Sequence, residues 1–381
     1  MNWPTWMVAV CLSGALVLGG CASKETNDIR IGVNAEITGS KPTVGDSCKK
    51  AAELLAGQVN AAGGLKVGDK KYPLTLFIED NEDKPESAAA VAKKLISQDN
   101  VLAILGPNAS GNAIPAARIC EDARVIMISP WSTNPKTTEN MKYVFRACFL
   151  DDFQGEVMAK FARDNLKAKT AAVLYDVASE YNKGIAEFFK KSFEQMGGRV
   201  VAFESYTKDD KDFSSQLTKI KAANPEVLFL PNYYNEVPLQ AQQARRLGIT
   251  CPLIGSDSWG SSELLTLGGK DLEGAFFSSH YAPDIATPKA QEFIRAYEAK
   301  YGKKPDDVAA LTYDSGRLLL AAVAQAGSLD RQKVRDALAT ISKFEGVTGT
   351  MKFSGTGDPV KSAVIIQIKD GKFQYSTSVA P

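Results

Sequence analysis

Short apolar runs alternate with longer amphipathic segments along almost the whole chain. Continuous or β-branched apolar runs predict buried strands, and apolar positions recurring every 3.6 residues predict helices. The first part of the chain has expected strands at 29–33, 74–78, 101–105 and 125–129, and expected helices from about Asp46 to 62, at 85–96 and at 111–121. This alternation is typical of an α/β fold with a parallel sheet.

The same order of elements starts again near residue 151. Helices are expected at 153–166, 184–196, 212–223 and around 237–247, and strands at 171–175, 200–204, 227–230 and 252–255. Two pairs of segments also correspond at a constant offset of 126 residues, namely 101–107 with 227–231 and 124–129 with 250–255. Because a single core tends to divide at this chain length, the pattern predicts two Rossmann-like lobes with parallel central sheets.

The last part of the chain returns to both lobes. Three helices are expected, at 288–301, 306–326 and 331–341, and then a hairpin that turns at Asp370 and Gly371. No low-complexity linker separates the lobes, so extended crossings are expected at 147–151, 278–282 and 352–359. We therefore expect a three-strand hinge between an N-terminal lobe (29–149 and 280–355) and a C-terminal lobe (150–279 and 356–381).

Charge and composition favour binding over catalysis. Forty-five Lys and Arg against forty-four Asp and Glu leave a formal charge of +1. This balance does not favour the binding of nucleic acid, which needs an excess of positive charge. The chain has one histidine, His280, which removes most metal sites and every dyad or triad that needs a histidine base. We expect no cofactor and no metal.

The first residues predict an exported, lipid-anchored protein. Residues 1–20 carry no charged side chain, and their apolar core is shorter than the ~20 residues that span a membrane, which indicates a signal peptide. The segment ends in Leu18-Gly19-Gly20-Cys21, which resembles a bacterial lipobox with Cys21 as the lipidated residue. Residues 21–28 would be the lipidated tether. The alternative is an ordinary signal with an incidental cysteine.

Export would permit disulfides, but the spacing of the remaining four cysteines favours mostly free, buried thiols.

Common catalytic motifs are missing from the sequence. No G-x-G-x-x-G follows the first strand, and neither HExxH nor G-x-S-x-G occurs. Residues 255–262 have the glycine spacing of a phosphate-binding loop, but Ser261 stands where that loop needs its lysine. The acidic run Glu79–Asp83 is interpreted as a solvated turn rather than as a catalytic carboxylate pair.

Polar residues follow the carboxyl ends of several expected strands, which is where open α/β sheets bind ligands. Ser110 is expected to cap the helix at 111–121, beside free N–H groups that favour an anion. Residues 129–135 form a turn rich in hydroxyls. In the second half, Tyr233 offers aromatic surface and Asp257 a negative charge. An anion site on one lobe and a carboxylate on the other suit a zwitterion.

Over nearly all of residues 28–370 the chain resembles the leucine/isoleucine/valine-binding family, the solute receptors of branched-chain amino-acid ABC transporters. The resemblance rests on five motifs: 59–64 (VNAAGG), 127–135 (MISPWSTNP), Phe145-Arg146, 153–155 (FQG) and Asp212-Phe213. It implies the fold of a class I periplasmic binding protein, two Rossmann-like lobes joined by three hinge strands.

The resemblance also implies roles for individual residues. Ser110 and Thr133 would bind an α-carboxylate, and the Trp131 carbonyl and Asp257 would take an α-ammonium. Tyr181 and Tyr233 would be the aromatic walls. The implied ligand-binding set comprises Asn108, Ala109, Ser110, Trp131, Ser132, Thr133, Tyr181, Tyr233 and Asp257.

Departures from the family pattern fall on the side-chain pocket. Asn108 replaces an apolar residue, Val44 a tyrosine and Trp131 a small residue, while Asp83 and Ala109 occupy the positions of the family's first-lobe disulfide. A buried Asn108 amide must bond either to protein, which leaves an aliphatic pocket intact, or to a polar ligand side chain. The preferred side chain therefore stays open between leucine, isoleucine or valine and another polar or aromatic amino acid.

We interpret the chain as an extracytoplasmic solute receptor, at the periplasm or cell surface. It would be a monomer that meets the membrane only through its lipid, captures a free amino acid between its lobes and delivers it to an ABC transporter permease. The alternative is a ligand-sensing receptor that serves a signalling partner without transport. An enzyme is the third and weakest reading.

Overall fold

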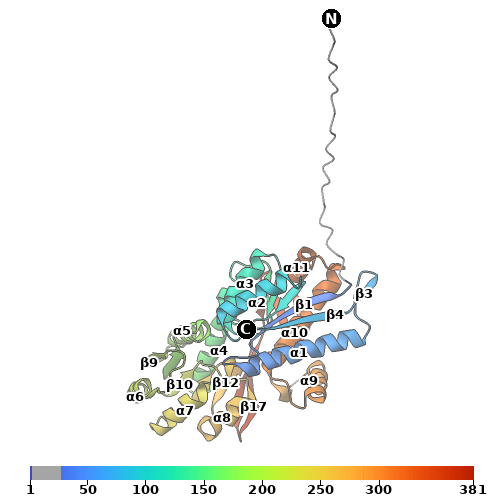
Figure 1. The fold of residues 1–381 in the computed structure, drawn as a ribbon. Coiled ribbons are helices and arrows are strands. Elements are labelled where there is room, and N and C mark those ends of the chain that lie inside the picture. The colour runs from blue at the N-terminus through green and yellow to red at the C-terminus, as the bar shows by residue number, and fades with distance from the viewer. Residues whose placement is uncertain (2–26, 286) are drawn as a thin grey trace.

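Two α/β lobes make up the computed structural model, which describes Met1, residues 27–285 and residues 287–381. Figure 1 shows the blue and orange elements gathered in one lobe and the green and yellow elements in the other. The expected fold class is confirmed. The expected signal peptide and Cys21 lie outside the described residues.

The N-terminal lobe is built on a five-stranded parallel sheet, in the order β4-β1-β5-β6-β7. Its strands are β1 (Ile29–Ala35), β4 (Leu74–Asp80), β5 (Ala103–Leu105), β6 (Ile126–Ser129) and β7 (Val144–Arg146). The helices around this sheet are α1 (Pro42–Ala61), α2 (Pro85–Ser97), α3 (Ser110–Asp122), α9 (Pro288–Tyr301), α10 (Asp307–Ala326) and α11 (Arg331–Thr340). Two small sheets complete the lobe: β2 (Leu65–Val67) with β3 (Lys70–Tyr72), and β13 (Lys343–Gly346), β14 (Gly349–Phe353) and β15 (Pro359–Val360).

The side chains of successive residues in these strands belong to two separate apolar clusters, one on each face of the sheet. Ile104 and Met127 pack with α2 and α3 in one buried cluster. Their neighbours Leu105 and Ile128 belong to the cluster on the other face, which holds Leu55 of α1 and Leu318 of α10. Because successive side chains of a strand point to opposite faces, helices can cover both faces of the sheet.

The C-terminal lobe is built on a seven-stranded sheet in the order β17-β16-β12-β11-β10-β8-β9. The five strands from β12 to β9 pair in parallel, whereas β16 and β17 are an antiparallel hairpin at one edge, as the Asp370-Gly371 turn predicts. The strands are β8 (Thr170–Asp176), β9 (Arg199–Tyr206), β10 (Val227–Leu230), β11 (Leu253–Gly255), β12 (Phe276–Ser279), β16 (Ala363–Lys369) and β17 (Lys372–Val379). The helices are α4 (Asp151–Asp164), α5 (Glu180–Gln195), α6 (Ser214–Ala223), α7 (Val237–Arg246) and α8 (Ser262–Gly268).

Several expected helix starts differ from the structure. Helix α5 begins at Glu180 rather than at 184, and α6 begins at Ser214 rather than at 212. Helix α1 begins at Pro42, a full turn before Asp46, because proline at the first helical position is preset for the helix and needs no N–H partner. Helix α4 begins at Asp151 rather than Phe153. Ser110 is the first residue of α3, so the N-cap is Ala109 and the Ser110 side chain does not cap the helix.

Four cysteines within the described part of the chain are free thiols. Cys48, Cys120 and Cys148 are buried and Cys251 is half-buried. Burial raises the pKa of Cys48 to about 11 and that of Cys120 to about 12, so neither is a reactive thiolate near neutral pH. Among the described helices, none is both long and apolar enough to cross a bilayer.

Candidate functional site

The carboxyl ends of the parallel strands in both sheets meet at the interface between the lobes. Loops after β5 and β6 come from the N-terminal lobe, and loops after β10 and β11 from the C-terminal lobe. Six of the predicted ligand-binding residues line one narrow void between the lobes, which is too small to admit a water molecule: Asn108, Ser110, Trp131, Tyr181, Tyr233 and Asp257. Residues far apart in the sequence are thus brought together as the strand-end rule predicts.

The other three predicted residues do not line this void but lie close to its lining residues in the sequence. Ala109 is buried between Asn108 and Ser110. The Ser132 hydroxyl donates to Ser110 Oγ over 3.0 Å and contacts Thr137 Oγ1 at 2.7 Å. Thr133 is buried, and its Oγ1 has no hydrogen bond of standard geometry within the described residues.

Asp257 is the carboxylate that the C-terminal lobe contributes. It is 1% exposed; its Oδ1 accepts the Tyr181 hydroxyl at 2.5 Å, and its Oδ2 lies 2.9 Å from His280 Nε2. Burial lowers the pKa of His280 to about 4, so the imidazole is neutral near pH 7 and its Nε2 carries the proton that Asp257 accepts. Sequence reasoning used His280 only as an argument against catalysis.

Glu36 occupies the anion site that the sequence predicts before α3. Its Oε1 accepts the backbone N–H groups of Asn108 (3.2 Å) and Ala109 (3.1 Å), and the Asn112 amide donates to the same oxygen. Its Oε2 accepts the Asn108 side-chain amide at 2.9 Å. The protein itself therefore supplies a carboxylate at these two N–H groups, and a ligand anion is left with those nearer Ser110 and Thr133.

The Asn108 side chain is only half satisfied by this arrangement. Its amide nitrogen bonds to Glu36, whereas its buried Oδ1 has no hydrogen bond of standard geometry within the described residues, and the Cys48 thiol lies next to the side chain. Asn108 is one of the residues that line the void. Its bond to Glu36 matches the first arrangement considered from the sequence, in which the amide bonds to protein.

Asp151 is a second buried carboxylate beside the predicted site, and the sequence did not identify it. Its backbone N–H donates to the Thr133 carbonyl at 3.0 Å. Burial raises its pKa well above the usual range, and the nearby Thr133 hydroxyl acts in the opposite direction. Neither carboxylate oxygen has a hydrogen bond of standard geometry within the described residues. A ligand cation beside Asp151 would favour the charged form that burial disfavours.

The acidic run Glu79–Asp83 is not the solvated turn expected from its sequence. Asp83 is 6% exposed and forms an ion pair of 2.5 Å with the buried ammonium of Lys41. Asn112 donates to its other oxygen at 3.0 Å. The Lys41 ammonium also lies 4.5 Å from the centroid of the Tyr233 ring, so a cation of one lobe contacts an aromatic ring of the other.

The loop that holds Trp131, Ser132 and Thr133 is fixed by the buried guanidinium of Arg146. Its nitrogens donate to the carbonyls of Ser132 (2.5 Å) and Asn134 (3.1 Å) and to the Thr138 hydroxyl (2.5 Å). Its Nε pairs with Asp358 at 2.6 Å. Five donors in a rigid fork suit such a set of acceptors better than a single ammonium does.

Other bonds join the lobes at the rim of the site. Asn134 donates to the Glu180 carbonyl at 2.9 Å, and Lys136 pairs with the Glu180 carboxylate at 2.7 Å. On another part of the rim, Asn235 donates to the Ser40 carbonyl at 3.1 Å. The void between the lobes has no room for a water molecule, so a ligand must enter when the lobes are further apart.

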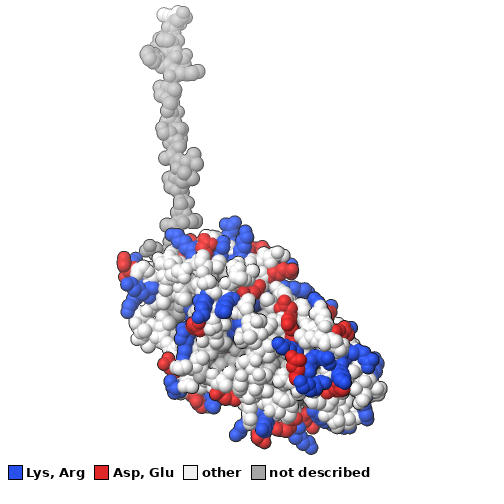
Figure 2. All heavy atoms as spheres, turned by 180° about the vertical axis from the view of Figure 1, so that it is seen from behind, with Lys and Arg blue, Asp and Glu red and all other residues white. Residues whose placement is uncertain are grey.

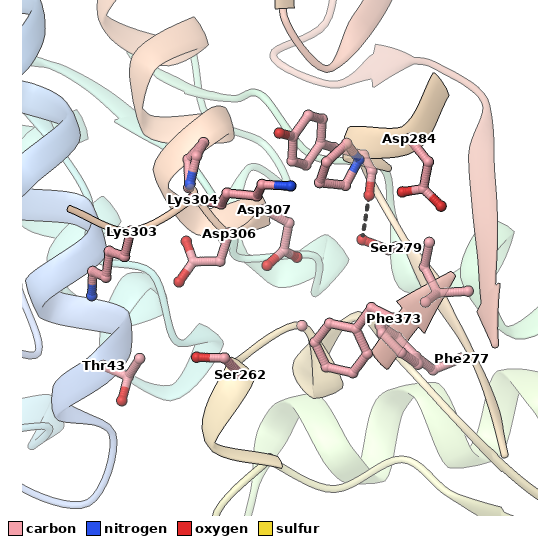
Figure 3. A pocket seen from close by; sticks show the side chains of 15 residues that line it. Thr43, Ser262, Phe277, Ser279, Asp284, Lys303, Lys304, Asp306, Asp307 and Phe373 are labelled. Carbon is pink, nitrogen blue, oxygen red and sulfur yellow. Dashed lines mark hydrogen bonds between the residues drawn. The ribbon is translucent and has the colours of Figure 1, made fainter. Parts of the chain in front are cut away.

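A second cavity, of about 940 Å³ with its open mouth, lies between the lobes nearby. Figure 3 shows Asp306 and Asp307 at the start of α10 facing Phe277 and Phe373 of the C-terminal sheet, with Lys303 at one side. One hydrogen bond joins the two linings: Asp307 Oδ2, at this cavity, accepts the indole N–H of Trp131, at the void, over 3.1 Å. Within the described residues no cluster of His, Cys, Asp and Glu has the geometry to hold a metal ion.

Comparison with known proteins agrees with this architecture. The family model "Periplasmic binding protein" matches residues 28–372. A Leu/Ile/Val-binding protein homolog of Brucella melitensis is 33% identical over 93% of this chain and 95% of its own. A leucine-, isoleucine-, valine-, threonine- and alanine-binding protein of Pseudomonas aeruginosa is 32% identical over 91% and 92%.

Solved structures show the same fold. A leucine-binding protein of Thermotoga maritima superposes with a TM-score of 0.88 at 34% identity, covering 93% of this chain and 99% of its own. A branched-chain amino-acid transporter substrate-binding protein of Streptococcus pneumoniae, in complex with isoleucine, has a TM-score of 0.87 at 33% identity, covering 93% and 100%. The chain belongs to the periplasmic binding protein family. It is thus an extracytoplasmic solute receptor and not an enzyme.

Proposed function

We propose that this receptor captures a free α-amino acid between its lobes and delivers it to the permease of an ABC transporter. The observation that carries the proposal is the position of Asp257, a buried carboxylate of one lobe that lines the same void as Ser110 and Trp131 of the other. A zwitterion needs an acceptor for its ammonium and donors for its carboxylate, because either charge is costly to bury unpaired. The names of the Pseudomonas and Streptococcus relatives support an amino-acid ligand.

In the proposed complex the α-carboxylate is bound by the hydroxyls of Ser110 and Thr133 and by nearby backbone N–H groups. The α-ammonium is bound by the Trp131 carbonyl and Asp257, with Asp151 close to Thr133 as a further acceptor. Tyr181 and Tyr233 cover the ligand, while Asn108, Ala109 and Ser132 complete the wall on the N-terminal lobe.

Capture requires the lobes to move about the crossing segments. We propose the lobes as 29–149 with 280–355 and 150–279 with 356–381, and the pairing of β15 with β14 favours a third crossing slightly later, at Lys361. The bonds of Glu180 and Asn235 across the rim are made in the closed form described here. A permease distinguishes closed from open receptor if ligand binding stabilises the closed form.

We also propose that the receptor is a monomer anchored to the membrane through a lipid on Cys21.

The binding test is isothermal titration calorimetry with the twenty amino acids, combined with small-angle scattering to detect closure. Saturable 1:1 binding with compaction is the expected result, and failure of every amino acid to bind would refute the proposal. Stimulation of the permease's ATPase activity by loaded receptor would separate transport from sensing through a signalling partner.

A further inference from the structure

His280 is a buried imidazole that contacts the proposed ammonium site without lining it. Its Nε2 lies 2.9 Å from Asp257 Oδ2, and of these two residues only Asp257 lines the void between the lobes. Resting on the proposed function, we infer that His280 is a positioning residue, which holds the Asp257 carboxylate in the orientation that binds the ligand ammonium. His280 thus acts on the ligand only through Asp257.

Two protein donors hold the carboxylate of Asp257, one at each oxygen. The Tyr181 hydroxyl, which also lies 2.8 Å from Ser256 Oγ, donates to Oδ1 at 2.5 Å. The imidazole of His280 donates to Oδ2. An ionised carboxylate has about four acceptor positions, so each oxygen keeps one for the ammonium. Donors at both oxygens fix the rotation of the carboxylate, which one donor alone does not.

The polar atoms of the imidazole show what a histidine provides at this position. Its Nδ1 is buried and has no hydrogen bond of standard geometry within the described residues. A buried polar atom without a partner costs stability, and an apolar side chain of similar size would fill the same space without that cost. The hydrogen bond to Asp257 is therefore what His280 provides and an apolar residue does not.

A neutral imidazole can orient Asp257 without neutralising it. Lys and Arg side chains lie on the outside of both lobes, among Asp and Glu (Figure 2), and either type could donate the same hydrogen bond. A permanent positive charge at position 280, however, would compete with the ligand ammonium for Asp257. The neutral ring donates one N–H and leaves the full negative charge of the carboxylate to the ligand.

Residues of the proposed hinge hold the imidazole itself. The ring of Phe149, in the first crossing, stacks on His280, in the second, with an interplanar angle of 30°. Lys361, in the proposed third crossing, donates to the Ala147 carbonyl at 3.4 Å. The orientation of Asp257 therefore depends on how the crossings pack. Substitutions in the hinge that contact no ligand atom should change the affinity for the ligand.

The experiment is isothermal titration calorimetry with the twenty amino acids on the wild type, His280→Leu and His280→Gln. His280→Leu removes the donor and keeps an apolar side chain of similar size. We expect its Kd to rise at least ~10-fold, because a hydrogen bond to a charged group is lost. His280→Gln keeps a neutral N–H donor and should stay within ~3-fold of the wild type.

Two further variants separate positioning from a general loss of stability. Ile220→Ala truncates a fully buried residue of α6 in the same lobe, and it should lower the urea midpoint without changing Kd. In an Asp257→Asn background, His280→Leu should cost at most ~3-fold, because no carboxylate charge is left to orient. If His280→Leu does not fold, Phe149→Leu removes the ring stacked on the imidazole and should raise Kd at least ~3-fold, but only while Asp257 is present.

Three results would overturn the inference. One is wild-type affinity in a folded His280→Leu or, in its place, in Phe149→Leu; another is an equal loss in His280→Gln; the third is an undiminished loss in the Asp257→Asn background. Each of these leaves amino-acid binding by the wild type intact. If no amino acid binds the wild type, the proposed function itself fails, so the two failures are distinguishable.

Discussion

His280 Nε2 lies 2.9 Å from Asp257 Oδ2, and both side chains are fully buried at the point where the chain leaves β12. The imidazole also stacks on Phe149, with ring centroids 3.7 Å apart. Phe149 and His280 belong to two of the predicted crossings between the lobes. The carboxylate proposed to bind the ligand ammonium is therefore oriented by a residue of the hinge.

Removing the charge of Asp257 should weaken amino-acid binding strongly. Asp257→Asn keeps the shape and an acceptor for Tyr181 but turns a charge-assisted bond into a neutral one. We expect a loss of about 2–3 kcal/mol, or roughly 30- to 150-fold in Kd by calorimetry. Asp164→Asn, on the exposed end of α4, is the control. Unchanged affinity in Asp257→Asn would show that this carboxylate does not bind the ammonium.

His280 should make the wild type lose stability in mild acid. Its pKa is lowered to about 4 in the folded protein, chiefly by burial, against about 6.5 in the unfolded chain, so the unfolded state binds the proton first. The contribution of neutral His280 to the free energy of unfolding is fully present above pH 6.5, and it is lost as the pH falls towards 4. Between pH 7.5 and pH 5 the wild type should lose about 2 kcal/mol more than His280→Gln, measured by urea unfolding. Parallel losses in both proteins would contradict this prediction.

Arg146→Lys should destabilise the protein although the charge is kept. One ammonium cannot reach the four acceptors that the guanidinium bonds, and Asp358 or two carbonyls would lose their donors. We expect about 3 kcal/mol less stability and weaker ligand binding, because the loop at 131–133 is no longer held. Arg199→Lys, at an exposed position, should have little effect on the urea midpoint. An unchanged urea midpoint in Arg146→Lys would contradict the conclusion that the guanidinium holds this loop in place.

Cys21→Ser should abolish lipid attachment. A hydroxyl cannot replace the thiol that carries the lipid in the proposed anchor, so the variant should appear unprocessed or free of the membrane. Mass spectrometry of the membrane fraction reports the modification directly. Unmodified Cys21 in mature wild-type protein would exclude the anchor and leave an ordinary signal with an incidental cysteine.

The local pattern of apolar and polar residues predicted most of the fold and part of the site. The apolar runs at 101–105 and 125–129 predicted β5 and β6, and the polar loops after them supplied Ser110 and Trp131 to the void. This worked because a strand's end is a local property, and parallel strands bring their ends to one edge. Asp257 was predicted from the same rule, whereas Tyr181 was predicted only from the family resemblance.

What the sequence could not reveal depends on contacts between distant residues. Glu36 and Asn108 are 72 positions apart, and Trp131 and Asp307 are 176 apart. Asp83 stands in an acidic run typical of a solvated turn, and only the tertiary structure brings Lys41 and Asn112 to it. Each of these carboxylates is buried because a specific partner lies next to it, and no local pattern records that partner.

The carboxylate of Glu36 at the start of α3 has a consequence for which anions the receptor can hold. A ligand bound at Ser110 would approach the Glu36 carboxylate, which already accepts the N–H groups of Asn108 and Ala109. One ligand carboxylate can be accommodated by the remaining donors, but an additional one would meet the Glu36 carboxylate with no free N–H group between them. Aspartate and other dicarboxylates should therefore bind more weakly than a zwitterion with one carboxylate.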